Sequence, residues 1–145
     1  MVEIAIEQNF SAPPERVFAV VTEHKRIEEW QKGIKVTLER PGIPSPNGLG
    51  AVRRIKNGPI SIREEVVRWE EARAMDYRVI GGAPLRDHLG EIRLAPAAGG
   101  GTQVTYRIRF GMPLYLGGDF AARIVASQLE RIIRAAYVRL AEETR

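Results

Sequence analysis

The chain has 145 residues, no cysteine and a net charge of +4, from 22 lysines and arginines against 18 aspartates and glutamates. This length suits one domain, and the lack of cysteine excludes disulfides, thiolate nucleophiles and cysteine metal sites. The arginines alternate with acidic residues and form no basic block, so we expect no nucleic-acid partner. No signal segment or long apolar run is apparent, and we expect a cytoplasmic protein without a transmembrane segment.

The first elements are a strand and two short helices. Residues 2–10 begin with the alternating pattern Val-Glu-Ile-Ala-Ile-Glu, which predicts a strand with one wet face. Pro13 and Pro14 suit the first turn of a helix, because their missing N–H groups have no intrahelical partner there. We expect Ser11 to cap this helix and a second short helix to follow at 24–30.

Six further strands are predicted in the middle of the chain. They are separated by short turns, of which Asn57-Gly58-Pro59 and the triple glycine at 99–101 are the clearest because glycine tolerates positive φ. Such connections predict an antiparallel meander. The expected strands are 34–40, 51–56, 60–69, 75–80, 85–94 and 103–110.

The C-terminal third predicts one long amphipathic helix at 118–143. Its apolar stripe recurs at about 100° per residue, and Glu130 and Arg134 are spaced to pair on the opposite side. The stripe contains Ala122, Val125, Leu129, Ile132, Ile133, Ala136 and Leu140. Since an antiparallel sheet must cover its apolar face, this helix should lie on the sheet. We therefore predict an α+β fold, a single domain over 1–145, with the two short helices crossing between strands one and two.

The order of these elements, together with several local motifs, resembles a known superfamily. The motifs are FSAPPERVFAVV at 10–21, Trp30, IREEV at 62–66 with Trp69-Glu70 and Tyr77 beyond it, and Leu94-Ala95-Pro96 leading to Gly100-Gly101-Thr102. They resemble the START-like helix-grip (SRPBCC) superfamily, in its polyketide cyclase/dehydrase and lipid-transport branch. The resemblance implies a seven-stranded sheet wrapped around the long helix, with a hydrophobic cavity between them. It leaves the chemistry open, because carriers, receptors, cyclases and interaction modules share this scaffold.

Alternation along the strands suggests which polar side chains face that cavity. In the last strand Tyr106 and Ile108 share the inward face, and Tyr77 points inward by the same rule. His88 is placed inward and Leu89 outward. Glu64 is placed inward as well, although a bulge would reverse it. An inward carboxylate needs a partner or a wet cavity.

His88 is the candidate catalytic residue, as an acid/base near neutral pH or as a hydrogen-bond partner for a ligand. The alternative is a partly wet histidine bonded to the backbone. Trp30 is expected at the cavity mouth, and 42–50 is expected to be a flexible flap that acts as a gate. The predicted ligand-binding set is Glu64, Tyr77, His88, Tyr106, Ile108, Val125, Gln128, Leu129, Ile132 and Ala136.

Several chemistries lack their motifs. His24 and His88 lack zinc-site spacing, no serine lies in a nucleophile elbow, and 42–50 lacks the lysine of a phosphate loop. We expect no metal and no cofactor. The first hypothesis is binding of an apolar small molecule such as a lipid, a polyketide-like compound or an isoprenoid. The alternatives are a cofactor-independent cyclase or dehydratase, and a protein-interaction module with a filled core; monomer and dimer both stay open.

Overall fold

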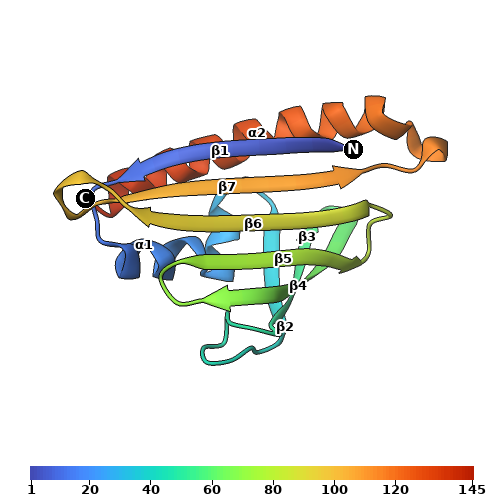
Figure 1. The fold of residues 1–145 in the computed structure, drawn as a ribbon. Coiled ribbons are helices and arrows are strands. Elements are labelled where there is room, and N and C mark those ends of the chain that lie inside the picture. Colours follow the sequence, from blue (N-terminus) through green and yellow to red (C-terminus); the bar gives the residue numbers. More distant parts are fainter.

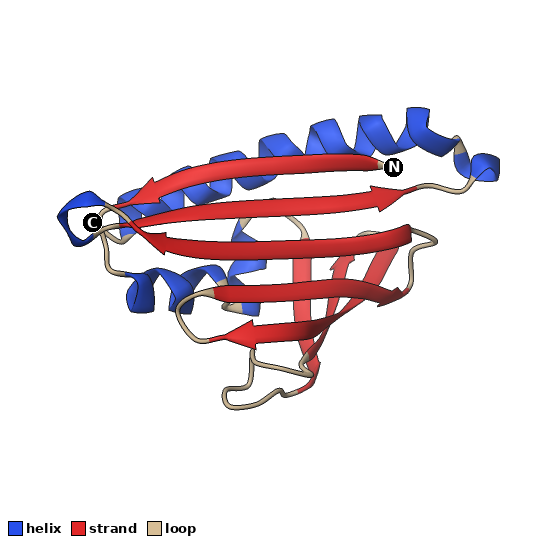
Figure 2. Ribbon diagram, viewed as in Figure 1, coloured by secondary structure: helices blue, strands red, loops and turns tan.

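A computed structural model describes all 145 residues as a curved sheet with one long helix (Figures 1 and 2). The strands are β1 (Val2–Phe10), β2 (Ile34–Arg40), β3 (Val52–Asn57), β4 (Ile60–Glu70), β5 (Ala74–Gly81), β6 (Arg86–Pro96) and β7 (Thr102–Gly111). The helices are α1 (Pro14–Val21) and α2 (Gly118–Glu143), with the 3₁₀ helices η1 (His24–Glu29), η2 (Ala98–Gly100) and η3 (Leu114–Leu116).

The seven strands form one antiparallel sheet in the order β1-β7-β6-β5-β4-β3-β2. The predicted meander of strands two to seven is confirmed, and β1 pairs with β7 from Val2↔Phe110 to Phe10↔Thr102. Since β1 and β2 lie at opposite edges, α1 and η1 make the crossover between them, as predicted. The helix-grip architecture expected from the sequence is therefore the observed one.

Helix α2 lies along β1 and β7, while β2, β3 and β4 curve away from it (Figure 1). Its buried face packs into a core of 22 residues that includes Ala122, Ala126, Ile133, Ala136 and Leu140. Val125 was predicted to belong to this face, but it is 40% exposed. The helix packs against β1 and β7 at one edge of the sheet. The side of the helix that carries Val125 therefore faces away from the close-packed core. No helix of the structure is long and apolar enough to cross a membrane.

The short helices differ from the expectation in their caps. The N-cap of α1 is Pro13, and no side chain accepts a hydrogen bond there, so the prediction that Ser11 caps the helix is wrong. Ser11 lies two residues before the cap, which puts its hydroxyl out of register with the free N–H groups. The second helix, η1, is a 3₁₀ helix capped by Glu23, whose carboxylate accepts from the Lys25 N–H at 3.4 Å.

The loop at 42–50, which we expected to be a flexible flap, is held by hydrogen bonds. The Ile43 N–H donates to the Leu49 carbonyl at 3.0 Å, and the Leu49 N–H donates back at 2.7 Å. The Asn47 side chain donates to the Glu23 carboxylate at 2.7 Å and also bonds His24. The loop is therefore tied to the start of η1.

Candidate functional site: a buried polar cluster on the inner face

A buried ion pair lies on the inner face of β3 and β4. Arg53 and Glu64 face each other across the two strands, with guanidinium nitrogens 2.9 Å from Glu64 Oε1. Both residues are 6% exposed. Glu64 points inward as the alternation predicted, and Arg53 is the partner that an inward carboxylate requires.

Arg53 was not predicted from the sequence, because the segment Val52-Arg53-Arg54-Ile55 shows no alternation. A usable signal was nevertheless present. The turn at Gly58 and Pro59 pairs Asn57 with Ile60, and counting back along both strands places Arg53 opposite Glu64. The register of this short hairpin is therefore enough to pair the two residues from the sequence alone.

Tyr77 extends the cluster onto β5. The Arg53 Cζ atom lies 4.7 Å from the centre of the Tyr77 ring, which is a cation–π contact. Tyr77 pairs across the sheet with Gly90 of β6, and a methyl group at position 90 would overlap the Tyr77 ring. Glycine at this position is what allows the ring to lie flat over β6.

Three tyrosines form a row from the sheet to the helix. The hydroxyls of Tyr77 and Tyr106 share a hydrogen bond, and the ring centres of Tyr106 and Tyr137 are 5.5 Å apart. Burial raises the pKa of each hydroxyl well above its usual value, and at Tyr77 the Glu64 charge raises the pKa further. All three hydroxyls therefore remain protonated at neutral pH, and each keeps a proton that it can donate in a hydrogen bond.

Tyr137 has a buried hydroxyl with no hydrogen-bond partner. Its side chain is 1% exposed and lies against Phe10, with ring centres 6.4 Å apart. Leaving a buried hydroxyl unpaired costs about 1–3 kcal/mol, so such groups are rare in close-packed cores. This residue was also missed from the sequence, although its position four residues after Ile133 places it on the apolar stripe of α2.

His88 fills a gap between β5 and β6. The pairing of these strands ends at Tyr77↔Gly90, and beyond that point His88 Nδ1 accepts the Val79 N–H at 3.0 Å. Its ring centre is 5.5 Å from that of Tyr77. Burial lowers the pKa of the imidazole, so the neutral ring carries its proton on Nε2. The geometry offers a hydrogen-bond donor and no free basic nitrogen, which favours the backbone-bonded alternative for His88.

A bulge between Arg86 and Leu89 changes the predicted alternation at the start of β6. Asp87 has a left-handed backbone with φ of 49°. Neighbours on a regular strand point to opposite faces, but Asp87 and His88 both border one surface cavity of about 390 Å³, together with Arg78, Leu89 and Arg109. No hydrogen bond joins Asp87 to His88, so they form no relay.

The structure does not bring the other residues of the predicted ligand-binding set together in one site. Ile108 and Ala136 are 3% exposed and belong to the close-packed core. Leu129 is half-buried against that core. Gln128 and Ile132 border a cavity of about 600 Å³ beside Trp30, at the gap between η1 and α2. Val125 is exposed on the same flank of the helix.

Part of the inner face beyond the polar cluster is apolar and incompletely covered. Ile55 and Ile62 face each other across β3 and β4, and Val79 pairs with Glu64 on β5. All three are only partly buried and lie outside the core cluster. Helix α2 makes few contacts with β2–β5, so this half of the inner face lacks the cover that β1 and β7 receive.

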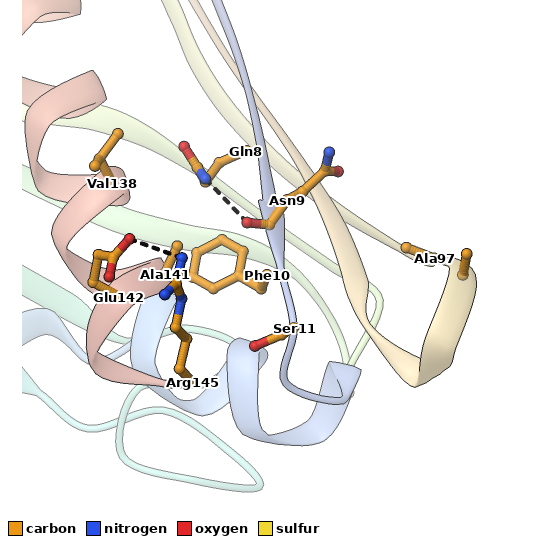
Figure 3. A pocket seen from close by; sticks show the side chains of 10 residues that line it. Gln8, Asn9, Phe10, Ser11, Ala97, Val138, Ala141, Glu142 and Arg145 are labelled. Carbon is orange, nitrogen blue, oxygen red and sulfur yellow. Dashed lines mark hydrogen bonds and ion pairs between the residues drawn. The ribbon is translucent and has the colours of Figure 1, made fainter.

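Another cavity, of about 540 Å³, lies at the far end of the molecule between β1, the β6–β7 connection and the end of α2 (Figure 3). Two contacts join polar groups that line it. The Gln8 amide donates to the Asn9 carbonyl at 3.0 Å, and Arg145 pairs with Glu142 at 3.2 Å. None of the cluster residues lines it, so we do not assign the site there.

The fold and the match to a family model place the chain among START-like helix-grip (SRPBCC) domains. More specifically, the chain belongs to the family described as polyketide cyclase/dehydrase and lipid transport, whose model matches residues 1–145. No curated protein matches the sequence.

Solved structures share this fold at low sequence identity. A START superfamily protein from Mycobacterium smegmatis is 13% identical, with a TM-score of 0.77 and 99% of each chain covered. Norcoclaurine synthase from Thalictrum flavum, in complex with dopamine and hydroxybenzaldehyde, is 13% identical, with a TM-score of 0.69 over 99% of this chain and 88% of that one. The Aha1 dimer from Colwellia psychrerythraea is 14% identical, with a TM-score of 0.68 over 98% and 95%.

Proposed function

We propose that the protein binds a small amphiphilic molecule, such as a lipid, a polyketide-like compound or an isoprenoid. Its apolar body would lie between the inner face of β3–β5 and the flank of α2 that carries Val125, Leu129 and Ile132. Its polar group would bond the tyrosine row. The observation that carries this proposal is the buried, unpartnered hydroxyl of Tyr137, a donor held in an apolar core with nothing to donate to.

The charges in the cluster favour a neutral polar group on the ligand. Glu64 already compensates the guanidinium of Arg53, and burial keeps the tyrosine hydroxyls protonated. A carbonyl or hydroxyl oxygen would satisfy Tyr137 without adding an uncompensated charge. A ligand carboxylate would have to compete with Glu64 for Arg53, at a high desolvation cost.

The apolar side chains of the inner face and of α2 suit the apolar body of such a ligand. Ile55, Ile62 and Val79 present partly exposed side chains on the inner face, and Leu129 is half-buried opposite the sheet. Binding sites for small molecules are mostly apolar, with a few polar groups that fix the orientation. Covering these side chains with a ligand removes apolar area from water, which supplies most of the binding free energy.

The direct test is thermal melting against fatty acids, sterols, quinones and aromatic polyketides. A ligand present at a hundred times its Kd adds about 2.7 kcal/mol. For a domain of this size we expect Tm to rise by roughly 5–10 °C. A shift confined to one chemical class identifies the ligand class. No shift across the panel contradicts the proposal and favours the interaction module.

Two variants then locate the site. Tyr137→Phe removes only the unpartnered hydroxyl, so the free protein should be as stable as before or slightly more stable, while Kd rises about threefold to tenfold. Tyr115→Phe makes the same change at a residue that is 80% exposed and serves as the control. Leu129→Trp should block binding by filling the space beside α2. Unchanged affinity in both Tyr137→Phe and Leu129→Trp would move the ligand elsewhere.

A cyclase or dehydratase activity is the second candidate. The hydroxyl pair of Tyr77 and Tyr106 next to His88 favours it, because protonated donors can stabilise negative charge that develops on a substrate carbonyl. The complex of norcoclaurine synthase with dopamine and hydroxybenzaldehyde supports small aromatic substrates for this fold. Turnover of a panel ligand that survives His88→Ala would remove His88 as the acid/base, and loss of turnover in Tyr106→Phe would assign the donor.

A further inference from the structure

One end of the molecule carries large apolar side chains that nothing covers. Leu114 is 89% exposed, Tyr115 80% and Phe120 73%. We call this surface the apolar end, and its residues are Met1, Leu114, Tyr115, Leu116, Phe120 and Ile124. Figure 1 shows η3 and the first turns of α2 projecting beyond the end of β7. Exposed apolar side chains gathered in this way mark an interaction surface.

The local backbone holds these side chains outward. Gly117 and Gly118 both have left-handed φ, of 106° and 55°, so the chain turns sharply between η3 and α2. Phe120 and Ile124 are one helical turn apart, on the face opposite the buried Ala122. The N-terminal ammonium bonds Asp119 at 2.7 Å, which brings Met1 beside the first turn of α2.

The apolar end is bordered by arginines that have no carboxylate partner. Arg86 pairs with Gly111 in the sheet, three residues before Leu114, and Arg123 follows Phe120 by three residues on the helix. Arg78 and Arg109 line the adjacent cavity. None of these four arginines makes an ion pair within 4 Å.

The nearby acids offset only part of this positive charge. Asp119 is held by the N-terminal ammonium, and Glu3 is 3.9 Å from Arg107. Asp87 lies among the arginines and makes no ion pair. The surface is therefore apolar at its centre and positive at its border.

We propose that this end docks on the surface of an anionic lipid bilayer. Leucine, tyrosine and phenylalanine side chains insert into the interfacial layer, and the four arginines bind lipid phosphates around them. A second copy of the chain is a poorer fit, because a two-fold contact through this face would bring the same unpaired arginines of both copies together. The proposal does not depend on the ligand site, since it uses none of the cluster residues.

The test is co-sedimentation of the full chain with vesicles. One set contains phosphatidylcholine alone, and the other contains phosphatidylcholine with roughly a third phosphatidylserine. We expect binding to the anionic vesicles that weakens as salt rises from about 50 to 500 mM, because salt screens the attraction between the arginines and the lipid phosphates. Binding to neutral vesicles should be at least about fivefold weaker, the factor that corresponds to about 1 kcal/mol for one basic residue at the surface.

Three variants connect the binding to this surface. Phe120→Glu should lower the partition coefficient by about tenfold or more, and Arg123→Glu by about fivefold or more. Val138→Glu is the matched control. It lies 18 residues, or five turns, after Phe120 on the same side of the same helix, is 51% exposed, and should bind as the unmodified chain does. All three positions are exposed, so Tm should not change.

Three results would overturn the proposal. The first is an absence of binding to anionic vesicles, and the second is a loss of binding in Val138→Glu equal to that in Phe120→Glu. The third is a concentration-dependent dimer in analytical ultracentrifugation that Phe120→Glu abolishes, which would assign the apolar end to a second copy. None of these results would contradict ligand binding at the inner-face cluster.

Discussion

The inner face of the sheet has two halves that differ in how they are filled. Around β1 and β7 it is closed by α2 and filled mainly by close-packed apolar side chains such as Ile4, Ile6 and Ile133, each at most 2% exposed. The buried side chains of Tyr106 and Tyr137 lie among them. Around β3–β5 it carries the Arg53–Glu64 ion pair and the Tyr77 hydroxyl, with the His88 imidazole at the gap between β5 and β6, and its apolar side chains are only partly covered. The same sheet therefore supports a core on one side and a candidate site on the other.

The two halves also differ in how much their side chains stabilise the fold. Apolar packing near α2 stabilises the fold at about 25 cal/mol per Å² of buried apolar surface. A buried ion pair contributes little net stability, because desolvation offsets its attraction. An unpaired hydroxyl destabilises outright. Such costs are retained in proteins mainly where a function requires the groups.

The prediction with the largest expected change in the free energy of unfolding concerns the ion pair in the β3–β5 half of the inner face. Glu64→Ala leaves the Arg53 guanidinium buried without a counter-charge, and we expect it to lower the free energy of unfolding by about 3–5 kcal/mol, measured by urea denaturation at pH 7. The control is Glu65→Ala, which breaks the exposed pair with Arg40 at 2.8 Å and should cost less than about 1 kcal/mol. Equal effects of the two variants would mean that water reaches Arg53.

The second prediction concerns the close-packed half of the inner face, which α2 covers around β1 and β7. Ile133 is 0% exposed, so Ile133→Ala should lower the free energy of unfolding by about 2–4 kcal/mol through lost packing and a residual cavity. Ile124→Ala, on the exposed side of the same helix, should change it by less than about 0.5 kcal/mol. Ligand affinity of the folded Ile133→Ala protein should be unchanged. A large change in affinity would show that the two halves are coupled.

The third prediction concerns the contact between β5 and β6. Gly90→Ala places a methyl group where the Tyr77 ring lies, so the ring must move away from Arg53. We expect a loss of about 1–3 kcal/mol in the free energy of unfolding and weaker ligand binding. Gly81→Ala meets only the flexible side chain of Arg63 and should be close to neutral in both assays. A neutral Gly90→Ala would mean that the ring position is not fixed.

The smallest effect is the pH dependence of His88. Burial lowers its pKa in the folded protein, so the unfolded chain takes up a proton first as pH falls below the usual value near 6.5. The stability that the neutral imidazole contributes is present above pH 6.5 and is lost as pH falls through the lowered folded pKa. His88→Asn keeps an acceptor for the Val79 N–H but does not titrate.

The measurement is the free energy of unfolding between pH 5 and 8 for both proteins. The difference between them isolates His88 from His24 and the carboxylates. We expect the unmodified chain to lose more stability than His88→Asn as pH falls. Parallel curves would show that the pKa of His88 is the same in the folded and unfolded chain, so that neither burial nor the bond to the Val79 N–H lowers it.

The sequence by itself determined the elements and their order. Alternation, turn glycines and a helical apolar stripe predicted the seven strands, the meander and α2, because these patterns depend on local geometry that few contacts can override. The inward phase of Glu64 and Tyr77 followed from the same alternation. The resemblance to START-like proteins supplied the overall arrangement, which the structure and the family match confirm.

Only the tertiary structure decided how the site is assembled. A bulge in β6 set the place of His88, and the packing of α2 against β1 and β7 exposed Val125. Both depend on contacts between residues far apart in the chain, so no local pattern records them. The pairing of Arg53 with Glu64 depends on both the sequence and the tertiary structure. The two-residue turn fixes the register that places them opposite each other, but only the folded structure shows that the pair is buried.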